Sequence, residues 1–153
     1  MIALDRKRLG WQKLVSTSPA HAELLVVDDE PDVRQTMERL VTQFGYSVRT
    51  AASAEEADTW LASKRFDALL LDIELPRMKG VEFLGWALQR DPEMAVVMMT
   101  GVDDPDIALE CLEAGARTYL VKPVEAKFLR IALRDALSMR RILVERNDLQ
   151  QRY

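Results

Sequence analysis

Short apolar runs alternate with longer amphipathic stretches from residue 23 onward. The apolar runs have the length and composition of β-strands, and each is followed by a stretch with helical spacing of its apolar residues. The runs are Leu24–Val27, Tyr46–Thr50, Ala68–Leu71, Ala95–Met99 and Thr118–Val121. Within them, Leu69–Leu71 and Val96–Met99 are apolar at consecutive positions, which is typical of parallel strands covered on both faces. The pattern predicts an α/β, doubly wound sheet of about 120 residues.

Residues that favour helix ends lie where this pattern requires them. Ser53 and Glu56 have the spacing of a capping box, and Asp104 precedes a proline that suits the first turn of a helix. Gly45 and Gly115 suit helix C-termini, because glycine adopts a left-handed backbone without strain. These signals divide the chain at the same positions as the hydrophobic pattern.

Both ends of the chain depart from the alternation. Residues 1–22 show neither the strand nor the helix spacing of apolar residues, and they end in a stretch rich in serine and proline. We therefore expect a loosely ordered N-terminal extension. The domain is expected to cover residues 23–137. Residues 138–153 prolong the last helix, which would be about 40 Å long from residue 125 if wholly helical. That is more than a small sheet needs, so an extended C-terminal helix should project from the domain.

The apolar residues of this last helix allow two interpretations. Its apolar face consists of Leu129, Leu133, Ala136, Leu137, Leu143 and Val144. Arg140 and Asn147 interrupt the heptad spacing of that face. One interpretation is a domain helix with a solvated end. We favour the other, a short coiled coil in which Asn147 sets the register.

The composition narrows the range of functions. With 48% hydrophobic and 30% charged residues, the chain has the composition of a soluble globular domain. A net charge of -4 disfavours nucleic acid as a partner, because binding its backbone requires clustered Lys and Arg. No apolar run approaches the roughly 18 residues that cross a bilayer, and no signal-peptide core is present. We therefore expect a cytoplasmic protein without a membrane partner.

A single cysteine and a single histidine restrict the chemistry further. Cys111 cannot form a disulfide within the chain, and His21 cannot form a multi-histidine metal site. We interpret Cys111 as a small apolar helix residue and His21 as a linker residue. Any metal site must therefore be built mainly from oxygen ligands.

Polar residues follow four of the predicted strands at the point where each strand ends. Asp28 and Asp29 follow the first strand, Asp72 the third, Thr100 the fourth and Lys122 the fifth. Ligands of open α/β sheets bind at these carboxyl ends, so the five side chains should lie at one edge. Taken singly, each has an ordinary explanation: Asp29 can cap the next helix, and the Thr100 hydroxyl can bond a loop carbonyl.

Three carboxylates at one edge need a cation between them. Two carboxylates about 4 Å apart repel by roughly 4 kcal/mol at an effective dielectric of 20. Lys122 supplies one positive charge, but Mg²⁺ with oxygen ligands fits better and leaves positions for phosphate oxygens. An aspartate carboxylate can attack phosphorus to give an aspartyl phosphate, while Lys122 and Thr100 neutralise charge on the transferring group.

At these residues the sequence resembles the receiver domains of bacterial two-component response regulators. The resemblance extends over roughly residues 23–137, in blocks with the family's order and spacing. The blocks are Leu24–Glu30, Leu70–Gly80, Met99–Gly101 and Ala114–Pro123. The resemblance implies a flavodoxin-like fold with five helices and strand order 2-1-3-4-5.

The resemblance also implies a role for each residue at the acidic edge. Asp72 would be the phosphoacceptor. Mg²⁺ would be held by Asp28, Asp29, Asp72 and the main-chain carbonyl of Glu74. Lys122, Thr100 and the backbone amide of Gly101 would contact the phosphoryl group.

Thr100 and Tyr119 would form a switch in such a domain, and they would change the face made by the fourth helix, fifth strand and fifth helix. The Lys122–Pro123 peptide bond is expected to be cis, as is usual in the family. Two residues depart from the family pattern, namely Lys79 and the acidic Glu74. Because Glu74 lies two residues after the acceptor, the lifetime of the phosphorylated form is left open.

The implied partner is a sensor histidine kinase or a phosphotransfer protein. The chain would not act as an enzyme on a separate substrate, because it would catalyse only its own phosphorylation and dephosphorylation. A homodimer is expected through the C-terminal helix or the switch face. Such helices resemble linkers to an output domain, including cyclic-dinucleotide domains, but no output domain is visible in the sequence.

Two other classes of protein share parts of this pattern. A haloacid-dehalogenase-type phosphatase also uses an aspartate nucleophile, Thr, Lys and Mg²⁺, but places its nucleophile after the first strand and its acidic pair late in the chain. Here the acidic pair comes first. A receiver-like scaffold that dimerises without phosphate is the second class. The intact set of acidic residues with Lys122 disfavours the scaffold.

Overall fold

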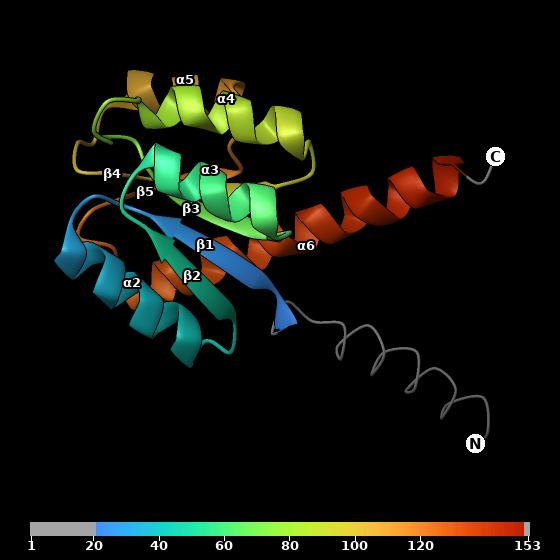
Figure 1. The fold of residues 1–153 in the computed structure, drawn as a ribbon, viewed down its shortest axis with the longest axis horizontal. Helices are drawn as coiled ribbons and strands as arrows, with labels where there is room; N and C mark the ends of the chain where they lie inside the picture. The colour runs from blue at the N-terminus through green and yellow to red at the C-terminus, as the bar shows by residue number, and fades with distance from the viewer. Residues whose placement is uncertain (1–20, 152–153) are drawn as a thin grey trace.

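The computed structural model describes residues 21–151, which form a parallel sheet between two layers of helices (Figure 1). The elements are β1 (Glu23–Val27), α2 (Pro31–Gln43), β2 (Ser47–Ala51), α3 (Ala54–Ser63), β3 (Ala68–Asp72), α4 (Gly80–Arg90), β4 (Ala95–Thr100), α5 (Pro105–Glu113), β5 (Thr118–Val121) and α6 (Ala126–Gln151). The strand order is β2-β1-β3-β4-β5, as predicted. The bounds of the five strands differ from the predicted bounds by at most one residue.

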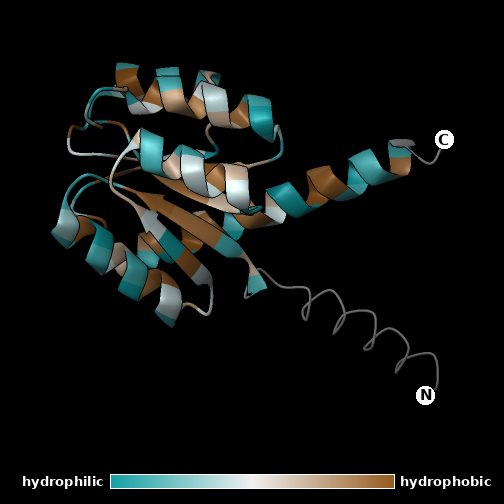
Figure 2. Cartoon of the chain, viewed as in Figure 1, coloured by the Kyte–Doolittle hydropathy of each residue, from teal (hydrophilic) through white to brown (hydrophobic). Residues whose placement is uncertain are grey.

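Both faces of the central strands are buried, which explains their consecutive apolar positions. Leu25 and Leu69 belong to the core cluster shared with α3, α4 and α5, whereas Leu24 and Leu70 belong to the cluster shared with α2 and α6. Neighbouring residues of a strand point to opposite faces, so each face needs its own apolar set. Figure 2 shows a largely hydrophobic β1 within the sheet and helices of mixed hydropathy around it.

The predicted helix ends are confirmed. Ser53 Oγ accepts a hydrogen bond from the Glu56 backbone N–H at 3.2 Å, and Asp104 caps α5 through the N–H of residue 106. Gly45 and Gly115 have φ values of 98° and 110° after the ends of α2 and α5. These local signals fix where each helix begins or ends, because they satisfy backbone groups that the helix itself leaves unpaired.

Helix α6 crosses the face of the sheet and continues past its edge (Figure 1). Four of the six residues assigned to its apolar face are buried in the core cluster that α6 shares with the sheet and α2. They are Leu129, Leu133, Ala136 and Leu137. These four side chains are therefore already used by the domain, and a coiled coil would have to form from other residues of α6. The predicted coiled coil stays a prediction.

Arg140, which interrupts the heptad spacing of α6, is buried against the domain. Its side chain is buried, with 4% of the residue exposed. Its Nε lies 3.5 Å from Asp67 Oδ1, and its Nη1 lies 3.1 Å from Asp91 Oδ2. Asp67 directly precedes β3, and Asp91 lies in the turn before β4, so the contact is at the amino ends of the strands. We call Arg140, Asp67 and Asp91 the amino-edge cluster.

Two further expectations concern the ends of the chain. The N-terminal extension expected for residues 1–22 lies almost wholly outside the described residues, so it stays a prediction. Near the other end, the Asn147 side chain hydrogen-bonds the Glu93 carboxylate, which ties α6 to the turn before β4. Among residues 21–151, no helix is both long enough and apolar enough to cross a membrane.

Candidate functional site

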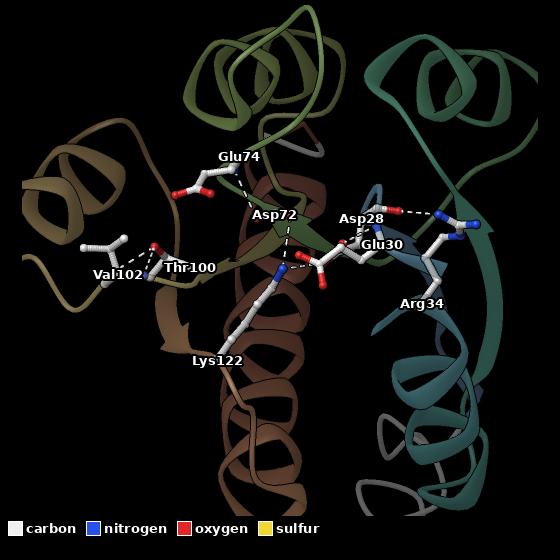
Figure 3. Close-up of polar contacts among 8 residues, drawn as sticks. All are labelled: Asp28, Glu30, Arg34, Asp72, Glu74, Thr100, Val102 and Lys122. Atoms are coloured by element: carbon white, nitrogen blue, oxygen red, sulfur yellow. Dashed lines mark hydrogen bonds and ion pairs between the residues drawn. The ribbon is translucent and has the colours of Figure 1, made fainter. Parts of the chain in front are cut away.

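The predicted polar residues meet at the carboxyl edge of the sheet. Asp72 ends β3, Asp28 directly follows β1, and Lys122 directly follows β5. One carboxylate oxygen from each of Asp28, Asp29 and Asp72 can be chosen so that all three lie within 4.8 Å of one another. We call these three aspartates and Lys122 the carboxyl-edge cluster, of which Figure 3 draws Asp28, Asp72 and Lys122. The parallel sheet brings them together because the carboxyl ends of parallel strands share one edge.

Asp28 is fully buried, and both its backbone and its side chain are bonded. Its N–H donates to Ala51 O at 3.1 Å, and its Oδ1 accepts from the Glu30 N–H at 2.9 Å. Its Oδ2 lies 2.7 Å from Lys122 Nζ. Its carbonyl oxygen accepts a hydrogen bond from Arg34 Nη1 at 2.8 Å (Figure 3). Asp28 is thus held in one orientation, whereas its neighbour Asp29 is exposed.

Asp72 is buried beside the same lysine. Its Oδ1 accepts from the Glu74 backbone N–H at 3.0 Å, and its Oδ2 lies 3.1 Å from Lys122 Nζ. Burial raises the pKa of Asp72 to about 6, and the Asp28 charge adds to this effect against the opposing influence of Glu74 and Lys122. The carboxylate therefore lacks sufficient compensation for its charge. A further cation beside it would stabilise the ionised form.

Lys122 bridges the two buried carboxylates. Burial alone would lower the pKa of its ammonium, but the hydrogen bonds and charges of Asp28 and Asp72 outweigh burial and raise it. Lys122 therefore stays positively charged, and it is one cation beside three carboxyl groups. The Lys122–Pro123 peptide bond is cis, as expected.

Thr100 lies at the same edge, but its hydroxyl is turned toward its own loop. Its Oγ1 donates to Val102 O and accepts from the Val102 N–H, both at 3.1 Å (Figure 3). The ordinary explanation for this residue is thus found in the structure. Gly101 is exposed, and a Cβ built on it would meet no atom within 4 Å. Tyr119 is half-buried against the core cluster shared with α3, α4 and α5.

Two residues that position the site were not recognised from the sequence. A Cβ on Gly80 would lie 2.3 Å from Asp72 O and 2.7 Å from the Ile73 Cα, so only glycine lets α4 begin so close to Asp72. Gly80 lies in a motif that is visible in the sequence, but the close approach is not. Arg34 lies five residues after the acidic pair, and no sequence rule identifies its partner as the Asp28 carbonyl.

The donor set fits a hard divalent cation. Its ligands are carboxylate oxygens, and the cluster contains neither histidine nor cysteine. Among the described residues, the Lys122 ammonium, at 2.7 Å, is the only partner found for Asp28 Oδ2. Oxygen ligands with excess negative charge favour Mg²⁺ or a similar ion over zinc.

The fold and its acidic edge define the class to which the chain belongs, that of flavodoxin-like α/β domains. Within this class, the family model described as "Response regulator receiver domain" matches residues 24–134. The chain therefore belongs to the response regulator receiver family.

Individual relatives agree with this assignment. The response regulator protein PilR of Pseudomonas aeruginosa is 37% identical over 116 residues, which cover 76% of this chain and 26% of PilR. A solved receiver domain protein from Clostridium thermocellum has a TM-score of 0.76 at 33% identity, covering 80% of this chain and 98% of that one. Solved NtrX from Brucella abortus has a TM-score of 0.81 at 30% identity, covering 87% and 31%. The chain thus spans about a quarter of PilR but nearly all of the receiver from Clostridium thermocellum.

Proposed function

We propose that this receiver domain accepts a phosphoryl group on Asp72 from a histidine kinase or a phosphotransfer protein, in a Mg²⁺-dependent reaction. The observation that carries the proposal is the carboxyl-edge cluster, in which a buried aspartate with a raised pKa lies beside two more aspartates and a lysine. Such an arrangement is costly for a protein that has no use for it, because the carboxylates repel one another.

The metal would be held by the carboxylates of Asp28, Asp29 and Asp72 and by the main-chain carbonyl of Glu74. When bound, Mg²⁺ supplies positive charge that offsets both the repulsion between the aspartates and the charge of the phosphoryl oxygens. Asp28 is suited to this role because its backbone and carboxylate are already fixed. Asp29 is exposed and can receive an ion from solvent.

The side chains at the edge have separate roles in the phosphoryl transfer. A carboxylate oxygen of Asp72 attacks phosphorus, the new O–P bond forms, and the N–P bond of the donor breaks as the imidazole nitrogen leaves with the bonding pair. Lys122 moves from pairing with Asp72 to pairing with a phosphoryl oxygen. The Thr100 hydroxyl and the Gly101 amide contact the other phosphoryl oxygens. Water later hydrolyses the acyl phosphate, so the domain acts on itself and not as an enzyme on a separate substrate.

The same proposal assigns the switch to Thr100 and Tyr119. The Thr100 hydroxyl would leave its bonds to Val102 and turn toward the phosphoryl group, and Tyr119 would move in response. This would alter the face formed by α5, β5 and α6. Several large apolar side chains are exposed on these elements, which supports their use as a homodimer surface. They include Leu109, Leu112, Val121, Phe128 and Ile131.

We also propose a cytoplasmic setting in which α6 leads into an output domain. The matched segment covers only 26% of PilR and 31% of NtrX, so both relatives are more than three times as long as that segment. Phosphorylation would then act by shifting the population between two states of the switch face, and only by as much as its affinities for the two states differ.

Beryllofluoride, which mimics an acyl phosphate, tests the proposal directly. We expect a bound fluorine signal in ¹⁹F NMR when Mg²⁺ and beryllofluoride are both present, and no such signal for Asp72→Asn. Sedimentation of the same samples measures whether occupancy promotes the homodimer. If the wild-type protein dimerises but never binds beryllofluoride, the chain is a scaffold that does not use phosphate. Rapid turnover of a generic phosphomonoester would instead favour a phosphatase.

A further inference from the structure

We propose that Arg34 is a positioning residue that holds Asp28 and Asp29 in the orientation needed to bind Mg²⁺, an inference that rests on the proposed function. Arg34 lies near the start of α2 and is half-buried. Its Nη1 donates to the main-chain carbonyl of Asp28 at 2.8 Å (Figure 3). Because this bond is made to the main chain, it does not compete with a metal ion for the carboxylate.

The start of α2 lacks the usual means of fixing a helix to the preceding strand. Glu30 is the N-cap residue, and no side chain makes a capping hydrogen bond there. Two bonds to Asp28 connect the helix to β1 instead, namely the Glu30 N–H to Asp28 Oδ1 and the Arg34 guanidinium to Asp28 O. The first bond uses a carboxylate oxygen that a metal ion can also bind. The Arg34 bond uses the main-chain carbonyl, so it remains available when the carboxylate holds a metal ion.

The planarity of the peptide bond extends the effect of Arg34 to Asp29. The carbonyl of Asp28 shares a rigid plane with the backbone nitrogen and the Cα of Asp29. The N–H of Asp28 is already fixed by Ala51 O, at 3.1 Å. Arg34 therefore fixes the peptide unit on the other side of Asp28. Since Asp29 is exposed, little burial orients it, and the position of its Cα depends on this plane.

Charge and position predict opposite effects of Arg34 on the metal. A guanidinium near the site repels a divalent cation, so if charge dominated, removing Arg34 would tighten Mg²⁺ binding. If position dominates, removing Arg34 frees the turn from residue 28 to residue 30 and weakens binding. Mutation of residues that hydrogen-bond to metal ligands typically changes metal affinity by a factor of 10 to 100. We expect about a tenfold effect here, the low end, because Arg34 acts on the backbone.

A magnesium titration of the folded protein separates these possibilities. The dissociation constant is measured by ¹H–¹⁵N NMR from the amide shifts of Asp29 and Glu74, well below the unfolding temperature. We expect Arg34→Met to raise the Kd about tenfold. The matched control is Arg39→Met, which removes the same charge from an exposed position on the same helix and should leave the Kd unchanged.

Arg34→Lys is the conservative variant, and it also serves if Arg34→Met does not fold. It keeps the charge and one donor but loses the rigid guanidinium, so the Kd should lie between those of the wild type and Arg34→Met. A wild-type Kd for the folded Arg34 variants overturns the inference, even if their melting temperatures fall, because the role is then only structural. Tighter binding overturns it in favour of a charge effect. If the wild-type protein takes up no Mg²⁺, the proposed function itself fails and this inference with it.

Discussion

Two charged clusters lie at opposite edges of the same sheet, and they differ in how their charges are satisfied. At the carboxyl edge, one lysine pairs with two buried aspartates, and a third, exposed aspartate lies beside them. At the amino edge, Arg140 pairs with two aspartates, each of which also accepts a backbone hydrogen bond. Asp67 Oδ2 accepts from the Glu23 N–H at 2.9 Å, and Asp91 Oδ1 accepts from the Glu93 N–H at 3.1 Å.

The aspartates of the amino-edge cluster are also more exposed to solvent than the paired aspartates of the carboxyl-edge cluster. The side chains of Asp67 and Asp91 are 41% and 20% exposed, so water shares their charge. The side chains of Asp28 and Asp72 are 0% and 3% exposed. The amino edge thus pairs its buried cation with two partly solvated carboxylates, whereas the carboxyl edge retains buried negative charge that a metal ion can compensate. The comparison indicates that burial without a matching cation, and not burial alone, distinguishes the edge to which we assign the function.

The largest effect is expected at the amino edge. The double change Asp67→Asn with Asp91→Asn keeps acceptors for the two backbone N–H groups but leaves the buried Arg140 without a counter-ion. Breaking a buried ion pair in this way should destabilise the protein by about 3 kcal/mol, measured by urea unfolding. The control is Glu55→Gln, which breaks the exposed pair with Arg77 and should leave the urea midpoint unchanged. A midpoint equal to that of the wild type in the double variant would contradict a structural role.

At the carboxyl edge, the close approach of α4 to Asp72 gives the next largest effect. Gly80→Ala places a Cβ against the Asp72 carbonyl. The backbone must shift to relieve this contact, which should lower the free energy of unfolding by about 2 kcal/mol. Gly85→Ala is the matched control on the same helix, because its Cβ would meet no atom within 4 Å. There the helix propensity of alanine should stabilise the protein by about 0.5 to 1 kcal/mol. Equal stabilities of the two variants in urea would rule out the steric account.

At Asp72, in contrast, an Asp→Asn change should raise the stability of the protein. Because the pKa of Asp72 in the folded protein is raised to about 6, its ionised form destabilises the metal-free fold at neutral pH. Asp72→Asn should therefore stabilise the protein by roughly 1 kcal/mol at pH 7.5 with a chelator present. The gain is less than the full pKa shift implies, because the pairing with Lys122 is also lost.

The sign of the pH dependence follows from the same shift. The unfolded chain binds fewer protons at Asp72 than the folded chain between pH 4 and 6, roughly, so this group lowers stability as pH rises through that range. The advantage of Asp72→Asn over the wild type should shrink as pH falls below about 6. An advantage that stays constant from pH 4.5 to 7.5 would show that Asp72 is not responsible.

A further predicted effect is on metal affinity at mildly acidic pH. Mg²⁺ binds the ionised carboxylate, so its Kd should rise as pH falls through the pKa of Asp72 at about 6, approaching about tenfold per pH unit below it. Above pH 7 the Kd should be nearly constant. Calorimetric titrations at pH 5, 6 and 7 measure this change. An affinity independent of pH over this range would separate Mg²⁺ binding from Asp72.

The carboxyl-edge cluster could be predicted from the sequence because two simple rules determine it. Apolar runs locate the strand ends, and a parallel sheet brings those ends to one edge, so Asp28, Asp72 and Lys122 had to lie close together. The close approach at Gly80 was not predicted, because it depends on the path of the loop after β3. The direction of the Thr100 hydroxyl was left open, since a rotamer is set by neighbours in space.

Arg140 shows most clearly what a periodic pattern leaves out. Along α6 it interrupts a heptad, and the sequence offers no sign that Asp67 and Asp91 lie beside it. Its partners are in loops about 50 and 70 residues away, and only the tertiary fold brings them to the helix. Arg34 was missed for a related reason, since its partner is a main-chain carbonyl and carries no side-chain signal.

Acetyl phosphate labelling tests the central claim, that the charge retained at the carboxyl edge serves to accept phosphate on Asp72. The protein is incubated with acetyl phosphate and Mg²⁺, and intact-mass spectrometry measures the added phosphoryl group before and after hydroxylamine, which cleaves acyl phosphates. The account predicts one labile phosphoryl group on the wild type, none on Asp72→Asn, and wild-type labelling of the double variant at Asp67 and Asp91 while it remains folded. Undiminished labelling of Asp72→Asn, or none on the wild type, would contradict it.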